Sequence, residues 1–84
     1  MLKVYGTKWC PHCTKTVEYL KYNDIEFEYL EIEKQSGNTI QKIIEVNGGD
    51  DWVVPTLELN GKWRKGKIYN EKKLGSDLEK LGLN

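Results

Sequence analysis

Apolar residues in the first third of the chain change their spacing twice. A short apolar run at Leu2–Tyr5 predicts a β-strand. Pro11–Tyr22 then shows helical spacing, because an apolar stripe repeats at i, i+4 and i+7. That stripe consists of Cys13, Val17 and Leu20. Ile25–Ile32 begins with an alternation of apolar and acidic side chains, which predicts a second strand. Together these segments predict a β-α-β unit, whose strands should be parallel and joined by a right-handed crossover.

The middle of the chain contains one more helical stripe and a hairpin signal. Ser36–Val46 carries isoleucines at helical spacing, and Asn47-Gly48-Gly49 after it is a typical helix stop. Asn60-Gly61 lies between the extended runs Pro55–Leu59 and Lys62–Lys65. An Asn-Gly pair between two extended runs is the strongest short-range signal for a β-hairpin.

A last stripe of leucines predicts a helix over Glu71–Leu81, and Asn70 before it is a favourable N-cap residue. The complete order, β-α-β-α-β-β-α, is that of an α/β protein. A mixed four-stranded sheet with helices on both faces would bury all of these apolar stripes.

Length and charge limit the possible functions. The chain has 84 residues, enough for one small core, so we expect a single domain over residues 1–84. Thirteen basic and thirteen acidic side chains cancel, so there is no general attraction to nucleic acid or membrane. No apolar stretch is long enough to cross a bilayer, and the first residues lack the pattern of a signal peptide. We therefore expect a cytoplasmic monomer.

The main chemical signal is Cys10-Pro11-His12-Cys13, which joins the first predicted strand to the first predicted helix. Residues i and i+3 lie on one helix face, so the two thiols can form a disulfide with little backbone movement. Pro11 suits the first helical position, where no backbone N–H is needed. Cys10 then lies at the helix start, where unpaired N–H groups and the helix dipole favour a thiolate. The thiolate is the nucleophile of sulfur chemistry, so the motif predicts thiol–disulfide exchange in which Cys10 attacks and Cys13 resolves.

Two other uses of the cysteines fit the sequence less well. A disulfide between Cys10 and Cys13 closes a very short loop, so as a structural crosslink it would restrict the unfolded chain little. A structural zinc site needs about four ligands, whereas the chain offers two cysteines and His12 as its one histidine. We therefore expect redox chemistry without a bound metal or cofactor.

The motif and a segment downstream resemble the glutaredoxins. Cys10-Pro11-His12-Cys13 follows a first strand, and Val53-Val54-Pro55-Thr56 opens the predicted hairpin. Trp9 before the motif, together with Val46-Asn47-Gly48-Gly49, is similar in particular to the glutaredoxin-like redoxins that include mycoredoxin. The resemblance extends over nearly the whole chain. It implies a thioredoxin-like fold and a thiol–disulfide oxidoreductase.

The resemblance also implies roles for residues around the motif. Pro55 is expected to be cis and to pack beside the cysteines, with the backbone of Val54 facing the site. An extended substrate, or the cysteine part of a bound thiol, would then pair with that backbone. Lys8 stands at a position that is often basic in this family, where it would hold a carboxylate or stabilise the Cys10 thiolate.

For His12 and the three tryptophans, alternatives remain open. A protonated His12 would favour the neighbouring thiolate and make the pair more oxidising; otherwise it is an exposed residue that fills the motif. Trp9 and Trp52 are candidates either for the walls of a substrate groove or for partly buried aromatics. Trp63, on the predicted hairpin, is interpreted as structural.

Two charged runs are interpreted as surface features. The basic run is either a docking patch for an acidic partner or protection of an edge strand, and we favour the second interpretation. It consists of Lys62, Arg64, Lys65 and Lys67. The acidic run predicts a solvated face. It consists of Glu26, Glu28, Glu31 and Glu33.

One segment departs from the pattern of glutathione binding. Glutaredoxins that bind glutathione usually carry Gly-Gly and then an acidic residue before the last helix, and Arg64–Glu71 retains Gly66 alone. The helix start near Asn70–Lys73 is a remaining candidate site for a carboxylate. The resemblance therefore leaves the reductant open between glutathione, another low-molecular-weight thiol and a flavoprotein reductase.

The leading hypothesis is reduction of protein disulfides, or of mixed disulfides between proteins and small thiols, by the Cys10/Cys13 dithiol. One alternative is a redoxin that a thioredoxin-reductase-type flavoprotein recharges and that serves a dedicated partner such as ribonucleotide reductase. A non-enzymatic alternative is a dimer that binds an iron–sulfur cluster through Cys10 and an external thiol.

Overall fold

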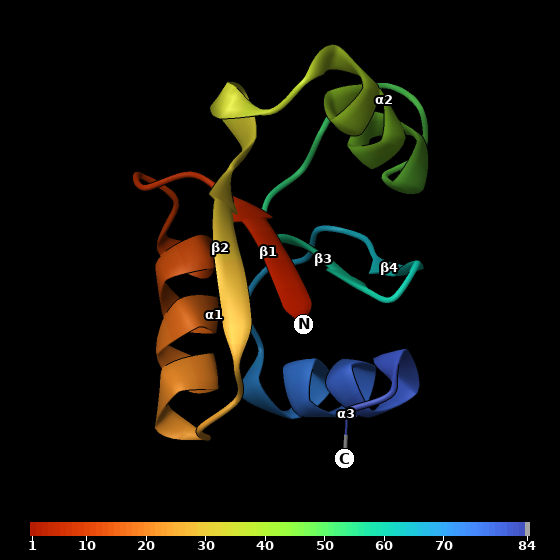
Figure 1. Ribbon diagram of the computed structural model, residues 1–84. Helices are drawn as coiled ribbons and strands as arrows, with labels where there is room; N and C mark the ends of the chain where they lie inside the picture. Colours follow the sequence, from red (N-terminus) through yellow and green to blue (C-terminus); the bar gives the residue numbers. More distant parts are fainter. Residues whose placement is uncertain (84) are drawn as a thin grey trace.

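The computed structural model describes residues 1–83 and contains the predicted elements in the predicted order (Figure 1). The strands are β1 (Leu2–Gly6), β2 (Phe27–Glu31), β3 (Thr56–Leu59) and β4 (Lys62–Arg64). The helices are α1 (Pro11–Tyr22), α2 (Gly37–Val46) and α3 (Glu71–Leu81), with a short 3-10 helix, η1 (Ile32–Lys34), between β2 and α2. None of the helices in residues 1–83 has the length and apolar character needed to cross a membrane.

The four strands form one mixed sheet in the order β2-β1-β3-β4. β1 and β2 are parallel, whereas β3 runs antiparallel to both β1 and β4. In the centre of the sheet, Val4 lies opposite Tyr29 on one side and opposite Leu57 on the other. The predicted α/β architecture is therefore confirmed, with the β-α-β unit and the hairpin joined through β1.

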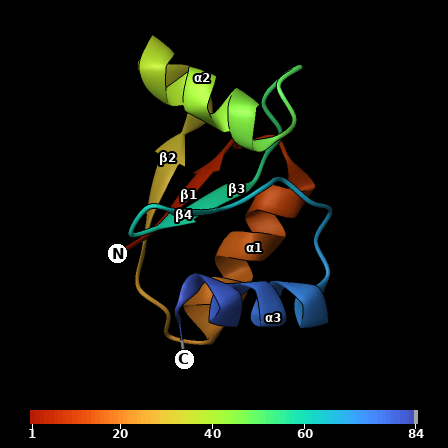
Figure 2. The ribbon, with the colours of Figure 1, turned by 90° about the vertical axis from the view of Figure 1, so that its right-hand side faces the viewer.

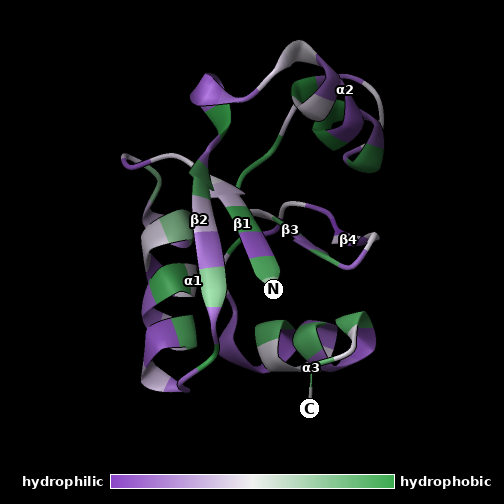
Figure 3. Cartoon of the chain, in the orientation of Figure 1, coloured by the Kyte–Doolittle hydropathy of each residue, from purple (hydrophilic) through white to green (hydrophobic). Residues whose placement is uncertain are grey.

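The helices cover both faces of the sheet (Figure 2). Side chains of a strand alternate between faces, and β1 shows this alternation of hydrophobic and hydrophilic positions in Figure 3. Leu2 and Val4 pack with α1 and α3 in the larger core cluster. That cluster also contains Leu20, Leu57, Leu59, Leu74, Leu78 and Leu81. Tyr5 points to the other face, where it packs with Ile32 and Ile43 under α2.

Two details of the predicted elements were wrong. The second strand spans Phe27–Glu31 instead of Ile25–Ile32: it begins two residues later, and it ends at Glu31 because Ile32 turns into η1 and is fully buried beside Ile43. On α1, Cys13 and Leu20 of the predicted stripe are buried, but Val17 is only half-buried, and Thr16 beside it is buried instead. Thr16 tolerates burial because its hydroxyl donates to the carbonyl oxygen of His12 at 2.8 Å.

Both later helices begin after side-chain caps: Asn70 caps α3 as predicted, and Ser36, predicted as the first residue of its helix, caps α2. Ser36 Oγ accepts the N–H of Thr39, and Asn70 Oδ1 accepts the N–H of Lys73. α3 ends at Gly82, whose φ of 114° lies in the left-handed region that favours glycine. These caps fix where α3 starts and so fix the length of the segment that connects it to β4.

Candidate active site

The N-terminus of α1 presents Cys10 as its N-cap residue, directly before Pro11. The backbone of Cys10 is extended, with φ −88° and ψ 116°, and its carbonyl oxygen accepts the N–H of Thr14 at 3.1 Å. Its side chain makes no capping hydrogen bond. The sulfur is therefore not used in capping, and Cys10 stands at the N-terminal end of the helix, where the first backbone N–H groups have no partner within the helix.

Cys13 lies one turn further and deeper. Both cysteines are free thiols, with 7% of Cys10 and 1% of Cys13 exposed. Burial raises the pKa of the Cys13 thiol to about 12, against the opposing effect of the Thr7 backbone N–H. Cys10 and Glu31 raise the pKa of Cys13 further. The two thiols therefore differ in accessibility, and Cys13 holds its proton firmly.

Gly6, at the end of β1, allows Cys13 to approach the sheet. A Cβ atom at position 6 would lie 2.9 Å from Cys13 Sγ and 3.3 Å from a ring carbon of Tyr29. The next residue, Thr7, is also buried, and its Oγ1 has no hydrogen-bond partner within residues 1–83. The depth of Cys13 thus depends on the absence of a side chain at Gly6.

Glu31 lies beside this end of the site, which corrects the prediction that the whole acidic run is solvated. Glu31 is half-buried, and its carboxylate accepts the backbone N–H of Lys8 at 3.4 Å and the hydroxyl of Tyr29 at 2.9 Å. Burial and this bond raise the pKa of Tyr29. The other acidic residues of the run are exposed, as predicted. Lys8 itself is exposed, and its backbone N–H is the group that bonds to Glu31.

His12 contacts a distant part of the chain instead of projecting into solvent. Its Nδ1 accepts the backbone N–H of Tyr69 at 3.0 Å, although 57 positions separate the two residues. His12 is half-buried. Figure 2 shows the segment between β4 and α3 passing over the N-terminal end of α1. The interpretation of His12 as an exposed motif residue is therefore wrong.

The loop before β3 is held by a polar network centred on Asn47. The Val54–Pro55 peptide bond is cis, as the resemblance implies, and Pro55 is fully buried. Thr56 Oγ1 donates to the carbonyl oxygen of Val53 at 2.6 Å and accepts from Asn47 Nδ2 at 3.0 Å. The sequence marks Asn47 as part of a helix stop and of the family resemblance, but nothing in its spacing indicates contacts outside α2.

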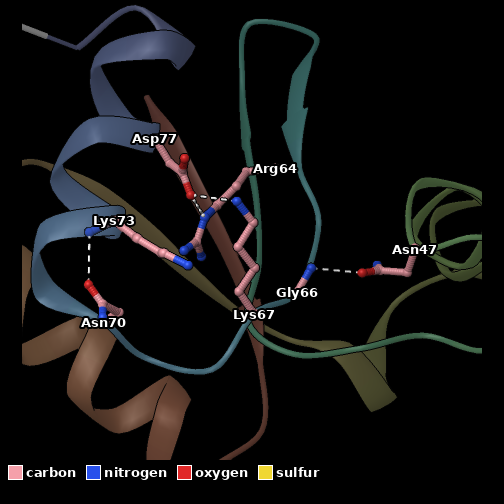
Figure 4. Close-up of polar contacts among 7 residues, drawn as sticks. All are labelled: Asn47, Arg64, Gly66, Lys67, Asn70, Lys73 and Asp77. Carbon is pink, nitrogen blue, oxygen red and sulfur yellow. Dashed lines mark hydrogen bonds and ion pairs between the residues drawn. The ribbon is translucent and has the colours of Figure 1, made fainter.

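The other end of the Asn47 side chain reaches the segment after β4. Asn47 Oδ1 accepts the backbone N–H of Gly66 at 2.7 Å (Figure 4). A Cβ atom at position 66 would overlap Val53 Cγ1 and lie 2.7 Å from Val53 Cβ. Gly66 is thus the position where the loop before β3 and the segment after β4 meet.

Two members of the basic run are ion-paired, which corrects their interpretation as edge protection. Arg64 Nε and Lys67 Nζ each lie 2.8 Å from Asp77 Oδ2 on α3 (Figure 4). Arg64 is buried. Burial would raise the pKa of Asp77, but the hydrogen bonds from Lys67 and Arg64 outweigh it and lower that pKa. Lys62 and Lys65 are exposed. Asp77 cannot be recognised from the sequence, since no motif surrounds it.

The tryptophans occupy three different environments. Trp9 is 70% exposed, so it does not pack under Cys10. Trp52 is partly buried in the smaller core cluster together with Val54. Trp63 stacks on Tyr5 with ring centroids 5.9 Å apart, as expected for a structural residue.

The candidate carboxylate site at the start of α3 is partly used by the protein itself. The side-chain oxygen of Asn70 accepts the N–H of Lys73, and the carbonyl oxygen of Asn70 accepts the N–H of Leu74. Within residues 1–83, no three His, Cys, Asp or Glu side chains gather in an arrangement that would hold a metal ion.

Comparison with known proteins identifies the family. Residues 2–63, which include the cysteine motif and the cis-proline segment, match the family model named Glutaredoxin. The chain belongs to the glutaredoxin family. The glutaredoxin (grx-1) from Archaeoglobus fulgidus is 34% identical with a TM-score of 0.68, and the match covers 89% of this chain and 82% of that one.

Two further comparisons cover nearly the whole chain, one in sequence and one in fold. A glutaredoxin-like 8.6 kDa protein in the rubredoxin operon of Clostridium pasteurianum, described as uncharacterized, is 28% identical over 95% of this chain and 100% of its own length. The wheat glutaredoxin, at 24% identity, shares the fold with a TM-score of 0.61 over 96% of this chain and 72% of that one. Family membership supports a function in thiol oxidoreduction and a thioredoxin-like fold.

Proposed function

We propose that this glutaredoxin-family protein is a thiol–disulfide oxidoreductase in which Cys10 attacks and Cys13 resolves. One observation carries the proposal: two thiols one helical turn apart at the N-terminus of α1 differ in depth. Cys10 lies at the helix start, and the pKa of the buried Cys13 is raised to about 12. The attacking thiol must reach a disulfide in another molecule, and Cys10 is the less deeply buried of the two cysteines.

The reaction exchanges two electrons in two steps. The Cys10 thiolate attacks one sulfur of a target disulfide, so a Cys10–target bond forms, the target S–S bond breaks and the first target thiolate leaves and takes up a proton. Cys13 then loses its proton and attacks Cys10 Sγ, which releases the second target thiolate. The target is reduced, and the protein holds a Cys10–Cys13 disulfide that an external donor must reduce.

For the donor, we favour a flavoprotein reductase of the thioredoxin-reductase type over glutathione. The segment that would grip a γ-glutamyl group lacks the Gly-Gly pair, and its own backbone N–H groups at Gly66 and Tyr69 are occupied by Asn47 and His12. Fewer donors remain there for a carboxylate. The exposed Trp9 and the backbone of Val54 are the surfaces we propose for contact with a protein partner.

Serine variants of the two cysteines test the roles. Cys10→Ser should abolish reduction of a protein disulfide, because the attacking sulfur is absent. Cys13→Ser should also lose dithiol turnover, but it should accumulate a covalent adduct with a target that carries a disulfide. Mass spectrometry under non-reducing conditions measures the adduct. An adduct on Cys13 in the Cys10→Ser variant, with none on Cys10 in the other, would reverse the assignment.

A recharging assay tests the donor. Turnover of a protein disulfide is measured with NADPH and a thioredoxin-reductase-type flavoprotein, and separately with NADPH, glutathione reductase and glutathione. We expect faster turnover in the first arm. Faster turnover with glutathione would contradict the choice of donor and leave the cysteine roles intact.

A further inference from the structure

The segment Lys65–Asn70, which we call the strap, is held by contacts to three different parts of the chain, one of which is His12 in the cysteine motif. The Gly66 N–H is held by Asn47 at the end of α2, and the Tyr69 N–H by His12 in α1. Between them, the Lys67 ammonium lies 2.8 Å from Asp77 on α3. The contacts at Gly66 and Tyr69 hold backbone N–H groups, so they fix the path of the strap. Figure 4 shows the contact of Gly66 with Asn47 and that of Lys67 with Asp77.

The bond at Tyr69 specifies the state of the His12 ring. A ring nitrogen that accepts a hydrogen bond carries no proton, so the ring is neutral with its proton on Nε2. An imidazolium ring has donors on both nitrogens and cannot accept this N–H. In this contact His12 cannot play the role suggested by the sequence, in which a protonated His12 favours the Cys10 thiolate by its charge.

We propose that His12 is a positioning residue, whose neutral Nδ1 anchors the strap over the N-terminus of α1 and so fixes one wall of the site beside Cys10. The inference rests on the proposed function, since it assigns a wall of that same site. His12 makes this contact from within the cysteine motif, so the wall and the reactive thiol share one rigid helical turn.

The bond between His12 and the Tyr69 N–H also affects which thiol substrates the site can bind. While His12 holds the Tyr69 N–H, that donor is not available to a carboxylate of a small thiol. The Gly66 donor is occupied in the same way by Asn47. The strap is thus a preformed wall for a protein surface, which does not have to order this segment when it binds.

Amide hydrogen exchange of the reduced protein tests the anchor without any substrate. In His12→Ala, the Tyr69 amide should exchange about fivefold faster, the equilibrium factor for loss of one ordinary hydrogen bond. His12→Asn should keep most of the protection, because the Asn oxygen lies near the place of Nδ1. His12→Gln should resemble His12→Ala, because its oxygen lies further out. The Gly66 amide is the internal control and should not change.

Kinetics link the anchor to the site. For a protein disulfide, His12→Ala should raise KM about fivefold with a smaller change in kcat, and His12→Asn should restore KM. If His12→Asn matches His12→Ala in both exchange and KM, or if Tyr69 exchange is the same in all variants, the anchoring role is wrong. Absence of turnover in the wild type would instead contradict the proposed function, and the exchange result would stand by itself.

Discussion

The two sides of the site are built in different ways. The motif side, Gly6–Cys13, is made by local backbone: a strand end, a glycine and the first turn of a helix. The strap side is irregular, and side chains from α1, α2 and α3 hold it. The motif side therefore inherits its chemistry from a short stretch of sequence, whereas the strap side depends on contacts between residues far apart in the chain.

This difference suggests a division of work. The motif side supplies reactivity, because helix position and burial distinguish Cys10 from Cys13. The strap side supplies shape, because its contacts hold an irregular segment in place. The departure from the glutathione-binding pattern seen in the sequence, at Arg64–Glu71, lies on this side.

The largest effect on the strap side is expected from Asp77→Ala. This change leaves the buried Arg64 without its partner, and loss of one member of a buried ion pair costs about 3 kcal/mol. Denaturant unfolding at pH 7 measures the loss. Asp77→Asn is the control, since it keeps an acceptor for Arg64 and should lose less.

The same ion pairs predict a pH dependence. Because the pKa of Asp77 is lowered in the folded protein, its contribution is complete above the ordinary carboxyl pKa of about 4 and is lost as pH falls below it. The stability difference between the wild type and Asp77→Asn should therefore shrink below about pH 4. A difference that stays constant from pH 7 to pH 3 would mean that the charge of Asp77 does not stabilise the fold.

A pair of glycine substitutions compares the two sides directly. Gly66→Ala should cost about 2 kcal/mol, because the new Cβ overlaps the side chain of Val53 and approaches its backbone. Gly6→Ala should cost about 1–2 kcal/mol, because the Cys13 sulfur must move. Thermal unfolding measures both. The two variants should also differ in kinetics. Gly6→Ala should change the rate at which Cys13 resolves the mixed disulfide, and Gly66→Ala should change KM for a protein disulfide. The opposite pattern would contradict the assignment of reactivity to the motif side and of shape to the strap side.

The smallest effect is expected at the end of the strap. Asn70→Ala removes the cap that accepts the Lys73 N–H and should cost about 1 kcal/mol. Asn70→Ser keeps a capping oxygen and should retain most of that stability. Equal unfolding free energies for both variants would show that the cap is not needed to hold α3 beside the strap.

The sequence predicted the motif side well and the strap side poorly, for a physical reason. Helix caps, apolar periods and the Cys-Pro-His-Cys spacing are local, so α1, α3 and the candidate cysteines were placed correctly. The contacts of His12, Asn47 and Asp77 each join elements that only the folded sheet brings together. The exposure of Trp9 was equally unpredictable, because nothing local shows whether a neighbour covers the indole ring.

The burial of Cys13 determines the order in which the two cysteines react in the proposed mechanism. Because burial raises the pKa of the Cys13 thiol, Cys13 stays protonated while Cys10 is unreacted. Cys10 is itself one of the groups that raise this pKa. In the proposed reaction, a bond between Cys10 and a target removes the contribution of Cys10, so Cys13 becomes easier to ionise at that point, while burial still keeps its pKa above the ordinary value. Formation of the mixed disulfide at Cys10 would then promote the attack by Cys13, so the depth of the Cys13 sulfur sets the order of the two steps.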